Sequence, residues 1–138
     1  KRIYARAVDE VHKAVLEAFS IDRILTPEQD AARLLAQQLE LDGGAELFQI
    51  DENTYVFKFV VPSKLVGYHL NELNLEQEFG IKLISLIKGK QVQNFLGISV
   101  FEREVSNAFP EDYALQQGDG LVCYGPYSRF MQFWKSVR

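Results

Sequence analysis

The sequence predicts a mixed α/β fold in two parts, an α/β part with a parallel sheet followed by an α+β part. First, residues 2–25 alternate between strand-like runs and a helical pattern, as parallel α/β architectures do. Second, Thr26-Pro27-Glu28-Gln29 carries a helix-start signal. Third, strand-like runs dominate after Asp42-Gly43-Gly44. Together these observations divide the chain into residues 1–42 and residues 45–138.

The first part is expected to run strand, helix, strand, helix. Residues 2–7 and 21–25 are strand-like, and Asp9 and Glu10 favour a helix start because acidic groups suit the positive end of the helix dipole. The apolar residues of this helix recur at helical spacing: Val8, Val11, Val15 and Phe19. Two strands are too few for a stable sheet. We therefore expect further strands from outside this sequence, or another surface against which the segment packs.

The second helix is expected to run from Pro27 to about Leu41. Thr26 caps it, Pro27 suits the first helical position, and Gln29 completes a capping box. Its apolar residues form an unusually broad stripe, made of Ala31, Leu34, Leu35, Leu39 and Leu41 and widened by Ala32 and Ala36. Such a stripe indicates contact on more than one side, and like chains commonly pair with two-fold symmetry. The sequence thus predicts a homodimer.

The second part contains strand patterns at 45–50 and 54–61 and an apolar strand at 81–87. A helical stretch precedes Gly80, which we expect to be its C-cap. Residues 91–104 are apolar without a clean period, so their structure is left open. A strand at 121–124 is expected to stop at Gly125-Pro126. The last helix carries apolar residues at helical spacing: Phe130, Phe133, Trp134 and Val137.

Composition excludes several classes of protein. A hydrophobic content of 47% supports one ordinary core, and the absence of any run of about 20 apolar residues excludes a membrane span. The net charge is −4 with scattered Lys and Arg, which disfavours nucleic acid as a partner. The sequence starts at Lys1, and its only methionine is Met131, so we expect it to belong to a longer protein.

No catalytic set is found. His12 and His69 have no partner at metal-ligand spacing, and no serine lies in a nucleophile elbow. Cys123 lies in a strand pattern between Val122 and Tyr124, so we interpret it as a buried structural thiol. The Gly-x-Gly-x-x-Gly fingerprint of dinucleotide-binding folds is absent. We therefore predict that the chain is not an enzyme.

The order of several short motifs resembles the RCK family, the regulators of K⁺ conductance. The C-terminal part is similar to the family's TrkA-C subdomain in Val61-Pro62-Ser63, Leu65-Val66-Gly67, His69-Leu70-Asn71-Glu72-Leu73, Phe79-Gly80-Ile81, the strand 83–88, and Gln117-Gly118-Asp119 followed by residues 121–125. The N-terminal part resembles the end of the family's Rossmann subdomain in Ala5-Arg6-Ala7, Asp22-Arg23, Pro27-Glu28, Ala31-Ala32 and residues 34–36. The resemblance implies a fragment of an RCK Rossmann lobe at 1–42 and a TrkA-C subdomain at 45–138.

The resemblance also implies a function. It predicts a cytosolic ligand-sensing module at the inner face of the membrane that controls potassium transport through a channel or uptake system. Its partners would be a second copy, a higher ring-like assembly in the full-length protein, and a membrane subunit. A nucleotide, NAD or ATP/ADP, is implied for the full-length protein and none for this fragment, because the glycine-rich loop of the family lies upstream of Lys1. Two alternatives stay open, the cytosolic tail of a cation/proton antiporter and a fragment of a nicotinamide-dependent dehydrogenase.

The family suggests three candidate sites. Glu28 would help bind a cation, and Arg6 would face a nucleotide phosphate in a complete lobe. The third is a dimer cleft that binds cyclic di-AMP in some members, here assigned to Asn74, Glu76, Phe79, Ile81 and Lys82. Glu76 stands where those members have an arginine, and carboxylates repel a dianionic ligand. We therefore expect this cleft to take a cation or a neutral metabolite.

Residues 91–104 depart from the family pattern, which has only a short hairpin at this point. We expect an insertion or an extra element there.

Overall fold

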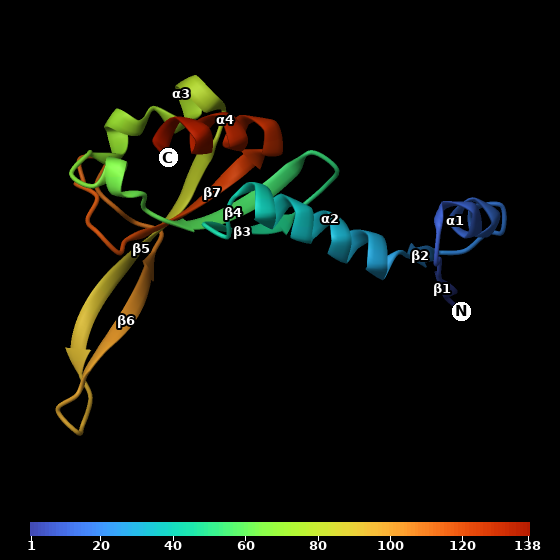
Figure 1. The fold of residues 1–138 in the computed structure, drawn as a ribbon, viewed down its shortest axis with the longest axis horizontal. Coiled ribbons are helices and arrows are strands. Elements are labelled where there is room, and N and C mark those ends of the chain that lie inside the picture. The colour runs from blue at the N-terminus through green and yellow to red at the C-terminus, as the bar shows by residue number, and fades with distance from the viewer. The chain divides into compact units, whose positions relative to one another are not determined.

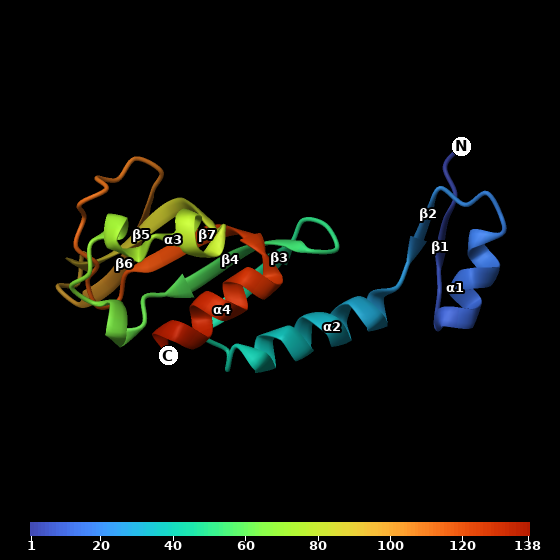
Figure 2. The same ribbon diagram turned by 90° about the horizontal axis from the view of Figure 1, so that it is seen from above.

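The computed structural model describes all 138 residues and divides into two compact units, Lys1–Glu40 and Leu41–Arg138. Figure 1 labels the elements of both units, and Figure 2 shows them from above. The fold is mixed α/β with an antiparallel sheet in the second unit, so the predicted fold class is confirmed at this level.

The first unit contains the predicted order of strand, helix, strand, helix: β1 (Tyr4–Arg6), α1 (Glu10–Glu17), β2 (Arg23–Leu25) and α2 (Pro27–Glu40). Strands β1 and β2 pair in parallel with Tyr4 opposite Arg23. Asp9 caps α1 by accepting a hydrogen bond from the backbone N–H of His12 at 2.7 Å. No residue of α1 or α2 is buried, and Ala7 is the one buried residue of this unit.

The predicted capping box at the start of α2 is wrong. The side chain of Gln29 does not turn back to Thr26 but donates to the carboxylate of Glu10 at 2.8 Å. The hydroxyl of Thr26 instead contacts the carboxylate of Asp30 at 3.3 Å. The tertiary contact between α1 and α2 therefore replaces the local one that the sequence pattern favoured.

The second unit is built on a five-stranded antiparallel sheet in the order β3-β4-β7-β5-β6. Its strands are β3 (Ala45–Gln49), β4 (Thr54–Val60), β5 (Lys82–Gln93), β6 (Ser99–Ser106) and β7 (Gly120–Pro126). Four helical segments connect or follow them: the 3₁₀ turns η1 (Ser63–Leu65) and η2 (Leu70–Leu73), and the helices α3 (Leu75–Phe79) and α4 (Tyr127–Val137). None of the α-helices in the chain has the length and hydropathy needed to span a bilayer.

The core lies on one side of this sheet. Side chains alternate along β4, so that Tyr55, Phe57 and Phe59 are buried while their neighbours are not. The rings of Phe57 and Phe130 stack with centroids 3.8 Å apart and an interplanar angle of 6°. The apolar residues of α4, η1, η2 and α3 join this same cluster. One face of the sheet is thus covered by helices.

Residues 91–104 are not a separate element. They complete a long hairpin in which β5 and β6 pair continuously from Leu86 opposite Ser106 to Gln93 opposite Ser99. The predicted end of the last strand also shifts, because β7 continues through Gly125 to Pro126. Proline is tolerated there because β5 pairs with β7 only as far as Tyr124, so no ladder bond is lost on that side.

Candidate functional site

A cavity of about 280 Å³ lies beside the short helices of the second unit. Its lining comes from η2, α3, the start of β5 and the loop before β7: Leu70, Asn71, Asn74, Leu75, Glu76, Gln77, Ile81, Lys82, Leu83, Phe109 and Glu111. The size approaches the lower end of the range for small-molecule sites. Four of the five cleft residues predicted from the sequence, Asn74, Glu76, Ile81 and Lys82, are among them.

Two residues with a left-handed backbone conformation shape the wall of this cavity. Asn74 has φ of 46° between η2 and α3, and Gly80 has φ of 62° at the end of α3. Asparagine and glycine are the residues that adopt this conformation most readily. The backbone N–H of Gly80 donates to the carbonyl of Glu76 at 3.0 Å, which closes the one-turn helix. This tight turn brings Glu76 and Lys82, six positions apart, to the wall of the same cavity.

The charged groups around the cavity are two carboxylates, Glu76 and Glu111, and one ammonium, Lys82. Glu111 is held by its backbone, because its carbonyl accepts from the N–H of Asn71 at 2.9 Å. Glu78 belongs to α3 but does not line the cavity. The site is therefore net negative, which suits a cationic or neutral ligand better than a dianion.

Phe79 and Ile81 are placed differently from the other predicted residues. The ring of Phe79 packs edge-on against Phe133 of α4, with centroids 5.5 Å apart, and is absent from the cavity wall. Ile81 is completely buried, so it closes the inner end of the cavity and presents little surface to a ligand. The polar contacts available to a ligand come from Asn74, Glu76 and Lys82.

Phe109 and Glu111 were not predicted as site residues. They belong to the loop between β6 and β7, about 30 positions after α3, and no motif marks them. Asp119 holds the far end of this loop. Its carboxylate, only 3% exposed as a residue, accepts from the hydroxyl of Tyr113 and from the N–H of Gln116, both at 2.9 Å. Burial and this neighbouring carboxylate raise the pKa of Tyr113 to about 12.

His69 and Glu72 form a local cap beside the site. The backbone N–H of His69 donates to the carboxylate of Glu72 at 2.6 Å, and the ring nitrogen Nδ1 lies 3.1 Å from the same oxygen. The backbone and side-chain hydrogen bonds from His69 lower the pKa of Glu72. The reciprocal contacts fix the start of η2. The role of His69 is therefore structural, with Glu72 as its partner.

The two candidates of the first unit contact each other. The guanidinium of Arg6 forms an ion pair with the carboxylate of Glu28, and both side chains are more than half exposed. A cation at Glu28 would compete with this guanidinium, and a phosphate at Arg6 would compete with this carboxylate. No group of three or more His, Cys, Asp or Glu side chains gathers at metal-binding distance anywhere in the chain.

The chain is similar over nearly its whole length to two potassium uptake proteins. It is 27% identical over 135 residues to the Ktr system potassium uptake protein C of Bacillus subtilis, covering 98% of this chain and 55% of that protein. It is 23% identical over 137 residues to the Ktr system potassium uptake protein A of Vibrio alginolyticus, covering 99% and 56%. The chain thus spans little more than half the length of these relatives. No protein-family model matches the chain.

Among solved structures, the GsuK channel bound to NAD aligns with 99% of this chain and 22% of that one, at 20% identity and a TM-score of 0.45. The similarity to the Ktr proteins confirms the resemblance to the RCK family that the sequence motifs predicted.

Proposed function

We propose that this chain is part of a cytosolic regulatory module that controls potassium transport by a membrane channel or uptake system. The observation that carries the proposal is the similarity to two Ktr potassium uptake proteins across 98% and 99% of the chain. In this proposal residues 1–42 end a Rossmann lobe of the RCK type, and residues 45–138 form the TrkA-C subdomain. The module acts at the inner face of the membrane, without enzymatic activity, as a homodimer within a larger ring.

A chimera tests this function. The segment of the Bacillus subtilis Ktr system potassium uptake protein C that aligns with this chain is replaced by residues 1–138. A strain lacking that protein is then grown at limiting potassium, and uptake is measured. We expect the chimera to restore uptake, and a version with the aligned segment deleted to fail. A chimera that folds and accumulates but restores nothing would contradict the proposal.

The cavity beside α3 is the proposed sensing site. A gate responds only to a ligand that binds one conformation better than another, and a tenfold shift takes about 1.4 kcal/mol of differential affinity. Asn74, Glu76 and Lys82 offer the polar contacts for such a difference, and Glu111 adds a second carboxylate. The favoured ligand is a cation or a neutral metabolite, because two carboxylates oppose a dianion.

Reversing one charge tests this site. In Glu76→Arg the guanidinium replaces a carboxylate of the cavity wall, so calorimetry should detect cyclic di-AMP binding that the parent chain lacks. Glu78→Arg is the matched control, since it makes the same change on the same helix outside the cavity. Tight binding by the parent would contradict the charge argument. Failure of Glu76→Arg to bind would mean that this cavity is not the cleft of the family.

Arg6 and Glu28 remain the proposed contacts for a nucleotide and a cation in the full-length protein. The N-terminal unit has no glycine-rich loop, and Ala7 is its only buried residue. Calorimetry of this chain with NAD or ATP is expected to show no saturable heat below millimolar concentration. Micromolar binding would show that the nucleotide site has been misplaced.

A further inference from the structure

The hairpin of β5 and β6 extends well beyond the sheet. β7 pairs with β5 only as far as Ile87, whereas β5 and β6 continue as a two-stranded ribbon to Gln93 and Ser99. We call residues 88–104 the arm; Figure 1 shows it leading away from the body of its unit. From Ile87 to Phe95 the chain advances eight residues, or about 25 Å at the rise of a strand.

The tip of the arm is suited to burial. Its three large apolar side chains, Phe95, Leu96 and Ile98, are 94%, 66% and 56% exposed. No charged residue occurs from position 91 to position 101. At the base of the arm four charges are matched, since Lys88 lies opposite Glu104 and Lys90 opposite Glu102. Arg103 lies opposite Gly89, away from the tip. Inserting the tip into an apolar surface would therefore bury no charged group.

The backbone N–H groups of Asn94, Leu96, Gly97 and Ile98 already have hydrogen-bond acceptors within the turn at the tip. The side-chain oxygen of Asn94 accepts from the N–H groups of Leu96 and Ile98 at 2.9 and 3.0 Å. The N–H of Asn94 donates to the carbonyl of Ile98, and the N–H of Gly97 donates to that of Asn94, both at 2.9 Å. Burying such a turn costs few hydrogen bonds to water.

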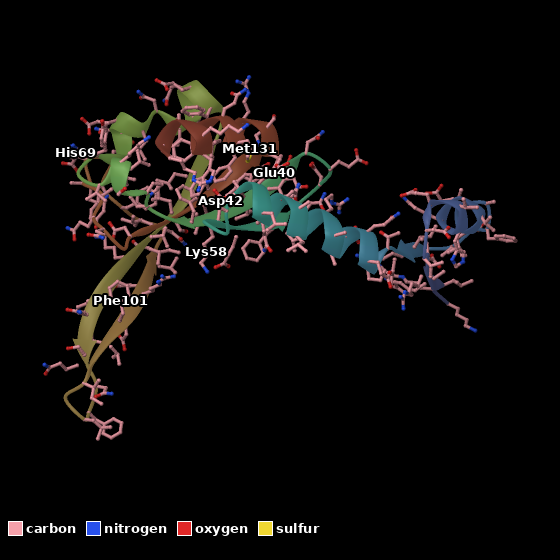
Figure 3. All side chains as sticks on the ribbon, viewed as in Figure 1. Glu40, Asp42, Lys58, His69, Phe101 and Met131 are labelled. Carbon is pink, nitrogen blue, oxygen red and sulfur yellow. The ribbon has the colours of Figure 1, made fainter.

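The same unit also carries an uncovered apolar sheet face, opposite the helices. Val60, Gly120, Ile87 and Val105 lie across four strands in one row, and Phe48, Val56 and Tyr124 lie in another. Figure 3 labels Lys58, which lies on this side of the sheet and away from Met131 of α4. It also labels Phe101, which lies on the hairpin of β5 and β6. We call this surface the open face; it continues along one side of the arm to Phe101, and its most exposed residues are Phe48, Val60, Phe101, Val105 and Tyr124.

The open face contains a hollow. Gly120 is part of its lining, and a Cβ added there would meet Cβ of Ile87 at 3.2 Å. The hollow has a volume of about 110 Å³ and is walled by Val60 and Arg103. At its rim Lys58 is paired with Glu46 at 3.0 Å, so this charge is already matched. The depression is of a size for a single side chain from a partner.

We propose that the arm of one chain docks its tip on the open face of a second copy, with each copy contributing one arm and one face. A reciprocal contact of this kind closes with two-fold symmetry. The arm cannot fold back on its own face, because its ladder of hydrogen bonds holds the tip away from the sheet. Three tip residues and five open-face residues expose roughly 100 Å² each, on the order of 800 Å² per copy. A stable interface needs about this area from each partner.

Cysteine cross-linking tests the contact, and the native thiol does not interfere. Cys123 is buried, which raises its pKa to about 12 and leaves it unreactive. A tagged Leu96→Cys chain is mixed with an untagged Val60→Cys chain and oxidised. We expect the mixed disulfide to dominate. Lys64→Cys, exposed on η1 and outside the open face, is the control and should not cross-link.

A second variant measures the strength of the contact. Replacing Phe95, Leu96 and Ile98 together by serine should weaken the dimer at least 100-fold by light scattering, because each buried apolar side chain contributes about tenfold or more. The fold should be unaffected, since these side chains do not belong to the core.

Three results would overturn the inference: disulfides only between two Leu96→Cys tips, a dimer unaffected by the triple replacement, or a monomeric parent chain. A monomer whose tip binds phosphatidylethanolamine/phosphatidylglycerol vesicles would assign the arm to lipid instead. The inference stands apart from the proposed function, since the chimera tests potassium uptake and this experiment tests one surface.

Discussion

The hydrogen bonds of Asp119 predict a large loss of stability when its side chain is removed. The buried carboxylate accepts from the hydroxyl of Tyr113 and the N–H of Gln116. A hydrogen bond to a charged group contributes about 1.5–3 kcal/mol, so losing both bonds in Asp119→Ala should lower the free energy of unfolding by about 3–6 kcal/mol. Asp112→Ala removes an exposed carboxylate from the same loop and should change it by less than about 0.5 kcal/mol.

A double-mutant cycle with Tyr113→Phe isolates one of these bonds. Urea unfolding is followed by the fluorescence of Trp134, the only tryptophan, which is buried in the core of the second unit and so reports that unit. We expect a coupling energy of at least about 1.5 kcal/mol between positions 113 and 119. Additivity of the two substitutions within about 0.5 kcal/mol would refute the idea that Asp119 anchors this loop.

Three further predictions concern the same unit. Because the pKa of Tyr113 rises from about 10 in the unfolded chain to about 12 in the fold, its contribution to stability should be complete below pH 10 and be lost as the pH rises towards 12; Tyr113→Phe should lack this component in unfolding curves. Phe130→Ala should cost about 3–5 kcal/mol by urea unfolding, because it removes the ring stacked on Phe57, whereas Phe95→Ala at the exposed tip should cost less than about 0.5 kcal/mol. Cys123 should react with a thiol reagent at pH 8 only after denaturation, and rapid reaction of the native chain would show that its burial is wrong.

Elements with one buried face were predictable from the sequence. Tyr55, Phe57 and Phe59 alternate with less buried residues, so a period of two reveals β4. The arm gave no such signal, because both of its faces are exposed and no alternation is required. The pairing of β5 with both β6 and β7 could not be predicted from the sequence either, because a long loop separates β6 from β7, which begins 14 positions after β6 ends.

The residues of the candidate site were also predictable only in part. Asn74, Glu76 and Lys82 were predictable as neighbours because one short turn joins them. Phe109 and Glu111 come from a loop whose position depends on the buried Asp119, and nothing in the local sequence shows where that loop lies. The direction of Phe79 was not predictable either, because a helix of five residues has too few turns to define a face.

The first unit has almost no hydrophobic core of its own. Ala7 is its only buried residue, and large apolar side chains of both helices are exposed, among them Val11 at 75% and Leu39 at 67%. A two-stranded sheet with one buried alanine cannot offset the entropy of ordering 40 residues, which costs about 1–2 kcal/mol per residue in backbone alone. We therefore expect the apolar surface of α1 and α2 to be covered by further strands or by another surface. The second unit has a continuous core of its own, so unfolding of the two units should be separable, with Trp134 reporting only the more stable one.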